Sequence, residues 1–153
     1  MSNWQNRIVG HEDVDPKTLV PHPMNFRTHP KAQRNAMGGA LTEIGWVQSV
    51  IVNKRSGRIV DGHLRVDLAI AEGAESVPVV YVDLSDEEER LALAVIDPIG
   101  AMAGKSEELF SALTADLHVD NADLMTLVRG HERRIGNTDP DDVPVVVEPI
   151  TKP

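Results

Sequence analysis

The chain has 153 residues and a formal net charge of −9, with 41% hydrophobic and 25% charged residues. This length allows one domain with a sizeable core and a small appendage. The chain contains no cysteine, which excludes disulfides, thiolate metal sites and cysteine nucleophiles. No apolar run reaches the ~20 residues that a membrane-spanning helix needs, and the N-terminal segment has no signal-peptide pattern.

The charge is distributed unevenly along the chain. Residues 1–70 contain nine Lys and Arg against six Asp and Glu, whereas residues 71–153 contain six against eighteen. A local basic patch can bind a polyanion, although the overall negative charge opposes loose association with DNA. The alternative is that Lys54, Arg55 and Arg58 are ordinary solvated residues of a hairpin turn.

The first third of the chain predicts an edge strand, a loop and a helix. Residues 6–14 alternate in polarity as an edge strand does, and residues 20–30 contain three prolines, which favour an extended loop. Apolar residues between positions 32 and 44 recur with helical spacing, and Gly45 is a typical helix end.

The middle of the chain predicts a small sheet. Residues 49–53 and 58–60 are typical of strands joined by a turn at 54–57, and residues 77–82 predict a further strand. A helix is expected between the second and the third of these strands, ending at Gly73. Six apolar residues are expected in the core: Leu64, Leu68, Ile51, Ile59, Val79 and Leu91.

The last third of the chain predicts short helices and a tail. Ser85 and Glu88 have the spacing of a capping box, for a helix that Asp97-Pro98 should stop after about Ile96. Further helices are expected after Ser106 and after Asp120 or Asn121, the latter reaching about Arg134. Residues 137–153 are rich in proline and acidic residues, which is typical of a linker or tail.

The segment Asp61-Gly62-His63-Leu64-Arg65 lies where the strand passes into the helix. Unpaired N–H groups and the helix dipole favour an anion at such a position. Asp61 is suited to cap the helix, Gly62 would let a ligand approach the backbone, and His63 and Arg65 would add donors. The alternative is a well-capped helix that carries two solvated polar residues.

Together with segments 19–27, 41–53 and 77–83, residues 57–65 resemble the ParB/sulfiredoxin-like domain. The resemblance covers roughly residues 8–98. Sulfiredoxins need a cysteine in their active-site turn, so this cysteine-free chain does not resemble them in function. The segments Asp61–Ala69 and Leu93–Ala103 are most similar to phage and prophage members of the ParB-like nuclease family, which are associated with DNA methyltransferases.

The resemblance implies an α+β fold, with a small mixed sheet and packed helices. The expected organisation is a ParB/sulfiredoxin-like domain at 1–98, a helical extension at 99–136 and an acidic proline-rich tail at 137–153. Residues 99–135 lack a convincing helix-turn-helix, and the segment Ala94–Pro98 departs from the "E-N-x-Q-R" motif of chromosome-partitioning clamps. Both departures argue against a clamp.

The implied function is binding of a nucleotide or DNA phosphate, assisting DNA modification or processing as a nuclease or NTP hydrolase. Two alternatives stay open: an inert protein-interaction module and a small-molecule kinase. The expected cofactor is an NTP with Mg²⁺. The expected partners are nucleic acid and a DNA methyltransferase or another phage DNA-processing protein, with no membrane. The expected location is the cytoplasm of a bacterial host.

The resemblance and the turn together give a set of candidate site residues. Arg65, His63, Gly62 and Arg27 are expected to bind phosphate, and charged His63 should bind it more strongly at pH 6 than at pH 8. Asp61 and Glu43 are the catalytic candidates, with Glu43 as a base or a metal-site carboxylate. No dedicated transition-metal site is expected, because the six histidines lack ligand spacing.

Overall fold

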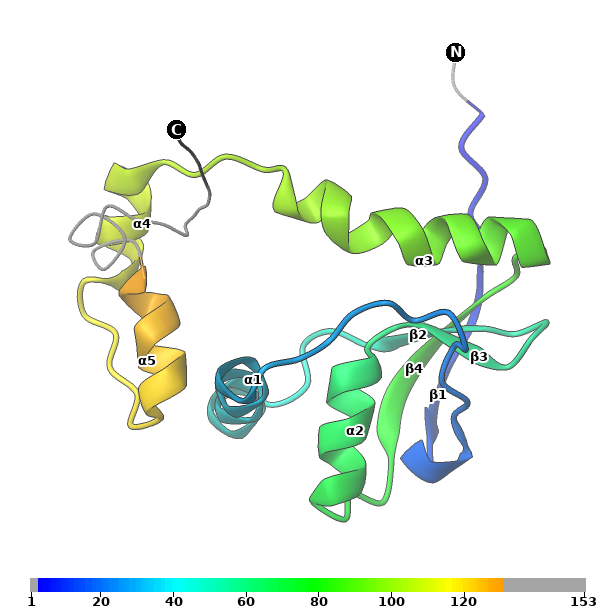
Figure 1. The fold of residues 1–153 in the computed structure, drawn as a ribbon, viewed down its shortest axis with the longest axis horizontal. Helices are drawn as coiled ribbons and strands as arrows, with labels where there is room; N and C mark the ends of the chain where they lie inside the picture. Colours follow the sequence, from blue (N-terminus) through cyan, green and yellow to red (C-terminus); the bar gives the residue numbers. More distant parts are fainter. Residues whose placement is uncertain (1–2, 131–153) are drawn as a thin grey trace, which may run out of the picture. The chain divides into compact units, whose positions relative to one another are not determined.

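The structure is a computed structural model that describes residues 3–130. The chain divides into two compact units, Met1–Gly104 and Lys105–Pro153. The elements of the described part are β1 (Ile8–Val14), the 3-10 turn η1 (Pro16–Thr18), α1 (Lys31–Ile44), β2 (Val50–Asn53), β3 (Arg58–Asp61), α2 (His63–Ala71), β4 (Val77–Val82), α3 (Asp86–Ala101), α4 (Glu107–Thr114) and α5 (Ala122–Val128) (Figure 1). This is the expected α+β fold.

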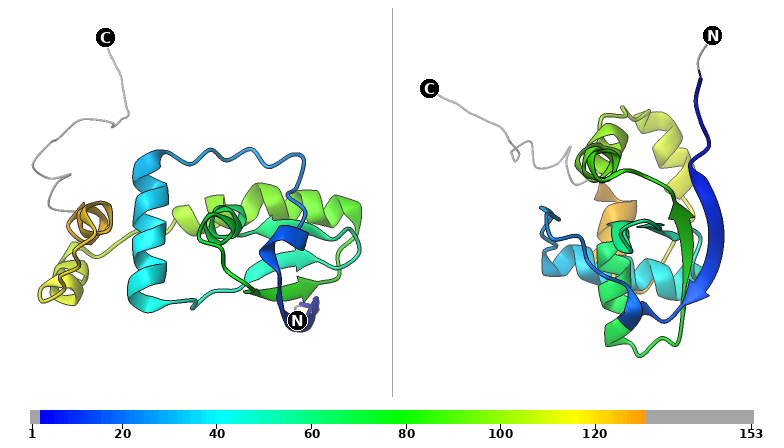
Figure 2. Two further views of the ribbon diagram at one scale, coloured as in Figure 1. Left: turned by 90° about the horizontal axis from the view of Figure 1, so that it is seen from below. Right: turned by 90° about the vertical axis from the view of Figure 1, so that its right-hand side faces the viewer.

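The first unit is built on a four-stranded mixed sheet with the strand order β1-β4-β2-β3. The strands β2 and β3 form an antiparallel hairpin, β2 pairs with β4 in parallel, and β1 pairs with β4 antiparallel. The parallel pairing requires a crossover, and α2 provides it. Helix α2 covers one face of the sheet (Figure 2).

The core lies between α2 and the sheet. Its strand residues are mostly β-branched, which suits a pleated, buried surface. Burial of each such side chain stabilises the fold by roughly 1.5–3 kcal/mol. The buried residues of this core are Val50, Val52, Ile59, Val66, Ala69, Val77 and Val79.

The strands and helices expected between residues 31 and 82 are confirmed, with boundaries that differ by one or two residues. Of the six expected core residues, three are buried: Leu64, Ile59 and Val79. Ile51 and Leu68 are half-buried. The prediction for Leu91 is wrong, because 62% of its surface is exposed on α3.

Helix α3 begins as expected and ends later than expected. The Ser85 side chain accepts a hydrogen bond from Glu88 N, and the Glu88 carboxylate accepts one from Ser85 N, so the capping box is confirmed. The expected stop at Asp97-Pro98 is wrong, because Pro98 lies inside the helix. A proline there leaves the Ala94 carbonyl without its helical donor, and exposure of Ala94 to solvent reduces that cost.

In the second unit, α4 and α5 are capped by side chains. Ser106 accepts a hydrogen bond from Leu109 N, and Asn121 accepts one from Leu124 N. The described helix α5 ends at Val128, while Arg134 and the expected tail at 137–153 lie outside the described residues. Among residues 3–130, no helix has the length and apolar character needed to span a membrane.

Candidate phosphate-binding site

The centre of the candidate site is the turn from β3 into α2. Gly62 is the N-cap of α2 and has a left-handed backbone with φ 109°. The expectation that Asp61 caps the helix is wrong, since α2 has no side-chain cap. The Asp61 carboxylate instead accepts a hydrogen bond from Nη2 of Arg65 at 3.3 Å. The first N–H groups of α2 therefore have no side-chain acceptor at this turn.

Position 62 requires glycine for two reasons. Its φ is costly for any residue with a Cβ. A Cβ there would also lie 3.3 Å from Cα and Cγ1 of Val50 and from Nη2 of Arg65. The backbone of the turn therefore lies against β2 with no space for a side chain on that side.

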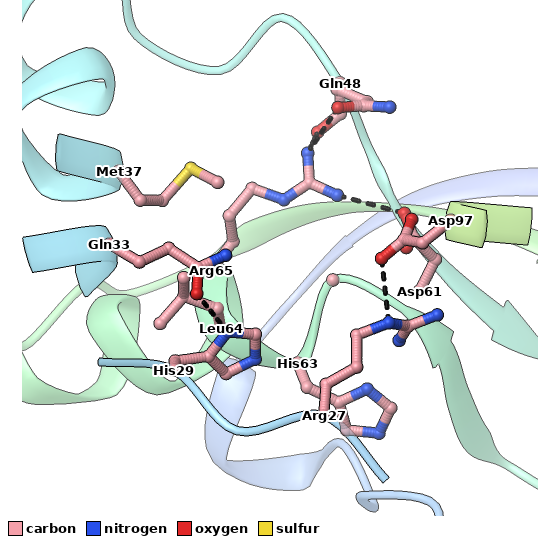
Figure 3. A pocket seen from close by; sticks show the side chains of 11 residues that line it. Arg27, His29, Gln33, Met37, Gln48, Asp61, His63, Leu64, Arg65 and Asp97 are labelled. Carbon is pink, nitrogen blue, oxygen red and sulfur yellow. Dashed lines mark hydrogen bonds and ion pairs between the residues drawn. The ribbon is translucent and has the colours of Figure 1, made fainter. Parts of the chain in front are cut away.

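Arg65 is a buried residue and not the solvated donor that the alternative interpretation assumed. Only 7% of its surface is exposed. Its Nη1 donates to the backbone oxygen of Gln48 at 3.0 Å and to Oε1 of Gln48 at 3.1 Å. With the bond to Asp61, Arg65 joins α2, β3 and the segment before β2 (Figure 3).

A pocket of about 170 Å³ opens at this turn. Its second arginine is Arg27, whose Nε lies 2.8 Å from Oδ2 of Asp97 on α3. Nη2 of Arg27 also donates to the Leu93 carbonyl at 3.2 Å. The residues that line the pocket are Arg27, His29, Gln33, Met37, Gln48, Asp61, Gly62, His63, Leu64, Arg65 and Asp97 (Figure 3).

Two carboxylates, Asp61 and Asp97, balance the two arginines of the pocket. Burial raises the pKa of the Asp61 carboxyl, and the charge of Asp97 raises it further, while Arg65 and Arg27 act in the opposite direction. Among the described residues, no group of three or more His, Cys, Asp or Glu side chains could hold a metal ion. Any divalent ion here would therefore need oxygen atoms from a ligand.

His63 lines the pocket, and its surroundings favour the neutral ring. Burial lowers its pKa from the ordinary 6.5, and the charge of Arg27 lowers it further; the smaller effects come from Asp67, His22 and His29. Nε2 of His63 accepts a hydrogen bond from the backbone N–H of His22 at 3.0 Å. In the neutral ring the proton is therefore on Nδ1, which is buried and has no hydrogen-bond partner in the described structure.

The catalytic candidate Glu43 and the three basic residues of the hairpin lie apart from this pocket. Glu43 is exposed near the end of α1 and does not line it. In the β2–β3 hairpin, Arg55 pairs with Asp83 at 2.6 Å, and Arg58 lies 3.6 Å from Glu89. Lys54 is exposed in the same hairpin. Arg27 and Arg65 are thus the lysine or arginine side chains that line the pocket.

The sequence interpretation missed Asp97 and Gln48 as site residues. Asp97 was assigned to a helix stop, and nothing in its local pattern shows that Arg27, 70 positions earlier, lies beside it. Both residues lie within segments that carry the family resemblance. Their place in these segments was the only feature of the sequence that could have marked Asp97 and Gln48 as site residues.

Comparison with known proteins gives related sequences and related folds. The ParB-like nuclease domain-containing protein YnaK of Escherichia coli K12 is 33% identical over 73 residues, which are 47% of this chain and 83% of that protein. No family model matches the chain.

Two solved structures share the fold at low identity. The chromosome-partitioning protein ParB from Caulobacter crescentus, C-terminally truncated and complexed with CTP-gamma-S, has a TM-score of 0.53 at 20% identity, covering 85% of this chain and 69% of that chain. A Pnob8-like ParB-N domain has a TM-score of 0.50 at 16% identity, covering 86% of this chain and 53% of that chain.

Proposed function

This chain belongs to the ParB-like nuclease domain family, and we propose that its pocket binds a phosphate group of a nucleotide or of DNA. The observation that carries the proposal is the convergence of three kinds of donor. Arg27 and Arg65, the His63 ring and the first backbone N–H groups of α2 meet in one pocket. Such a combination is typical of phosphate sites.

A nucleotide is the preferred source of that phosphate. The ParB of Caulobacter crescentus, which shares the fold, is complexed with CTP-gamma-S. Beyond the phosphates, Gln33 and Met37 of α1 offer an amide and an apolar side chain at the same pocket. Such groups suit a base or sugar. The wider role that we propose is assistance to DNA modification or processing, with nucleic acid and a DNA methyltransferase as partners.

An incoming phosphate would have to compete with Asp97 for Arg27. The Asp97 side chain is 53% exposed, whereas that of Arg27 is 17% exposed. Exchange of Asp97 for a phosphate would therefore return Asp97 to solvent and keep the less exposed Arg27 paired. Arg65 is held by Gln48 and Asp61, so its part is to place positive charge beside the turn.

Mg²⁺ fits the pocket only together with a ligand. Asp61 and Asp97 both line it, and Mg²⁺ in proteins is commonly held by one or two carboxylates and substrate phosphates. When bound, the ion would neutralise phosphate charge and allow both carboxylates to stay ionised. Nucleotide affinity should consequently increase in the presence of Mg²⁺.

The test is thermal unfolding of the protein with ATP, CTP, GTP and ADP, each with and without Mg²⁺. A ligand that binds the folded state raises the melting temperature. For the nucleotide with the largest effect, Arg27→Ala should weaken binding by ~1.5–3 kcal/mol in a calorimetric titration. Arg90→Ala is the matched control, because Arg90 is an exposed arginine of α3 that does not line the pocket.

The competing function is that of an inert interaction module. It is favoured by the pairing of both pocket arginines with carboxylates of the protein itself. No change in melting temperature with any nucleotide, together with no binding of a short DNA duplex at moderate salt, would support the inert module. A phosphorylated small-molecule product would instead identify a kinase.

A further inference from the structure

A buried carboxylate, Glu89 in the first turn of α3, gathers polar groups from the hairpin and from the proline-rich loop. Its exposed fraction is 0%. Oε1 accepts hydrogen bonds from Nδ2 of Asn53 at 2.6 Å and from Oγ of Ser56. Oε2 lies 2.9 Å from Nε2 of His22 and 3.6 Å from Nη1 of Arg58.

This cluster keeps Glu89 ionised. Burial raises the pKa of the Glu89 carboxyl, but the hydrogen bonds from Ser56 and Asn53, with the nearby His22 and Arg58 side chains, hold it below its usual range. A buried carboxylate is tolerated only where it is paired and hydrogen-bonded in this way. None of these four partners lines the pocket, so the cluster is separate from the phosphate site.

The ring of His22 is fixed in one orientation between two partners. Its Nδ1 accepts a hydrogen bond from the backbone N–H of Met24 at 3.0 Å. The proton of the neutral ring is therefore on Nε2, the nitrogen that faces Glu89. The side chain of His22 is 1% exposed, so this contact anchors the loop between Pro21 and Pro23.

The anchored loop reaches the pocket through its backbone. The N–H of His22 donates to Nε2 of His63, a residue that lines the pocket. A backbone N–H cannot act as an acceptor, so this bond requires an unprotonated Nε2 on His63. The bond therefore selects the neutral tautomer of His63 that carries its proton on Nδ1.

We propose that Glu89 and His22 are positioning residues that fix His63 as an Nδ1–H donor towards the pocket ligand. The inference rests on the proposed function only in taking the pocket as a ligand site. His63 then recognises a hydrogen-bond acceptor, such as a phosphate or carbonyl oxygen, without carrying charge. The ligand would satisfy Nδ1 of His63, which is buried and has no hydrogen-bond partner among the described residues.

The first measurement needs no ligand. In the ¹⁵N-labelled full chain at pH 7.5, the ring-nitrogen shifts of His63 should show a protonated Nδ1 and an unprotonated Nε2. A scalar coupling across the N–H···N bond should join the His22 amide to Nε2 of His63. A protonated Nε2, an averaged pair of shifts or the absence of this coupling would overturn the proposal.

The second measurement tests the two positioning residues. Glu89→Gln and His22→Ala should each give averaged ring-nitrogen shifts for His63 and weaken or abolish the coupling. Glu88→Gln is the matched control, because Glu88 is the preceding residue of α3, is exposed and pairs with Arg7. It should leave the His63 shifts unchanged. Folded variants with an unchanged His63 tautomer would refute the role of Glu89 and His22, and if neither variant folds, the wild-type coupling decides.

Titration with CTP separates this inference from the proposed function. If CTP binds the wild type, His22→Ala should weaken binding severalfold while Glu88→Gln leaves it unchanged. Binding should also shift the Nδ1–H proton resonance of His63. If CTP fails to bind, the nucleotide proposal fails for CTP, and the ligand-free tautomer still decides the positioning role.

Discussion

At Arg65 a single side chain combines a structural role with the functional role that we propose. Its guanidinium makes hydrogen bonds to Gln48 and Asp61 before any ligand is present. An arginine held by such hydrogen bonds is preorganised for ligand binding, because its side-chain entropy is already lost on folding. Arg27, whose partner Asp97 is exposed, is the more adaptable of the two.

We therefore expect Arg65→Ala to destabilise the protein, in contrast to the expectation for a solvated residue. The loss of charged hydrogen bonds to Gln48 and Asp61 should lower the free energy of unfolding by ~1.5–3 kcal/mol. Urea denaturation at pH 7 measures this. Arg90→Ala serves as the control, and equal stability of the two variants would contradict the structural role of Arg65.

The structure also changes the expected pH response of His63. Its folded pKa is lowered from 6.5, so the unfolded chain takes up the proton first as the pH falls. The free energy of unfolding should decrease as the pH falls through 6.5 towards the lower folded pKa, and this contribution should be constant above 6.5. His63→Gln should lose this part of the dependence in urea denaturation from pH 8 to pH 5. Identical pH profiles of variant and wild type would refute it.

At the scale of single elements, local patterns predicted most of the first unit. Alternating or continuous β-branched residues identify β2, β3 and β4, and Ser85 with Glu88 identifies the start of α3. These features depend on neighbours in the sequence. The end of α3 was missed because Arg27 holds Leu93 and Asp97 from a distant loop, which a local pattern cannot show.

The buried polar residues were also beyond local patterns. His22 lies among prolines and Glu89 lies in an acidic run, and both contexts are typical of the surface. Each is buried because the other supplies the compensating partner, together with Asn53 and Ser56. A long-range pair of this kind becomes visible only when the chain is folded.

The capping box of α3 has a measurable contribution of its own. We expect Ser85→Ala to lower the free energy of unfolding by ~1 kcal/mol, because Glu88 N loses its acceptor. Chemical denaturation measures the change. Ser76→Ala, at an exposed serine before β4, is the control and should be close to neutral. Equal effects of the two substitutions would show that the cap is not used in solution.

At the scale of the whole molecule, the core that the structure describes belongs to the first unit. Every buried hydrophobic residue of the described chain lies between Ala36 and Leu93, and α4 and α5 contain no buried residue. Folding of the first unit therefore does not depend on packing inside α4 or α5. The expected organisation into residues 1–98, 99–136 and 137–153 stays a prediction.

A fragment of residues 1–104 should consequently fold by itself. It retains the four strands and all of the buried hydrophobic residues found within residues 3–130. Circular dichroism should show a cooperative melt, and the His63 ring-nitrogen shifts should match those of the full chain. A fragment without a cooperative transition would show that the second unit supplies part of the core.

The strand order places β1 at one border of the sheet, where it has a neighbour on one side only. Exposed strand borders invite pairing with other chains and, with it, aggregation. Here β1 carries a bulge between Ile8 and Gly10, followed by His11, Glu12 and Asp13. Irregular pleating and consecutive polar residues are a common protection against such pairing. This border therefore favours solubility at high protein concentration, and replacing Glu12 and Asp13 with valines should promote fibril formation.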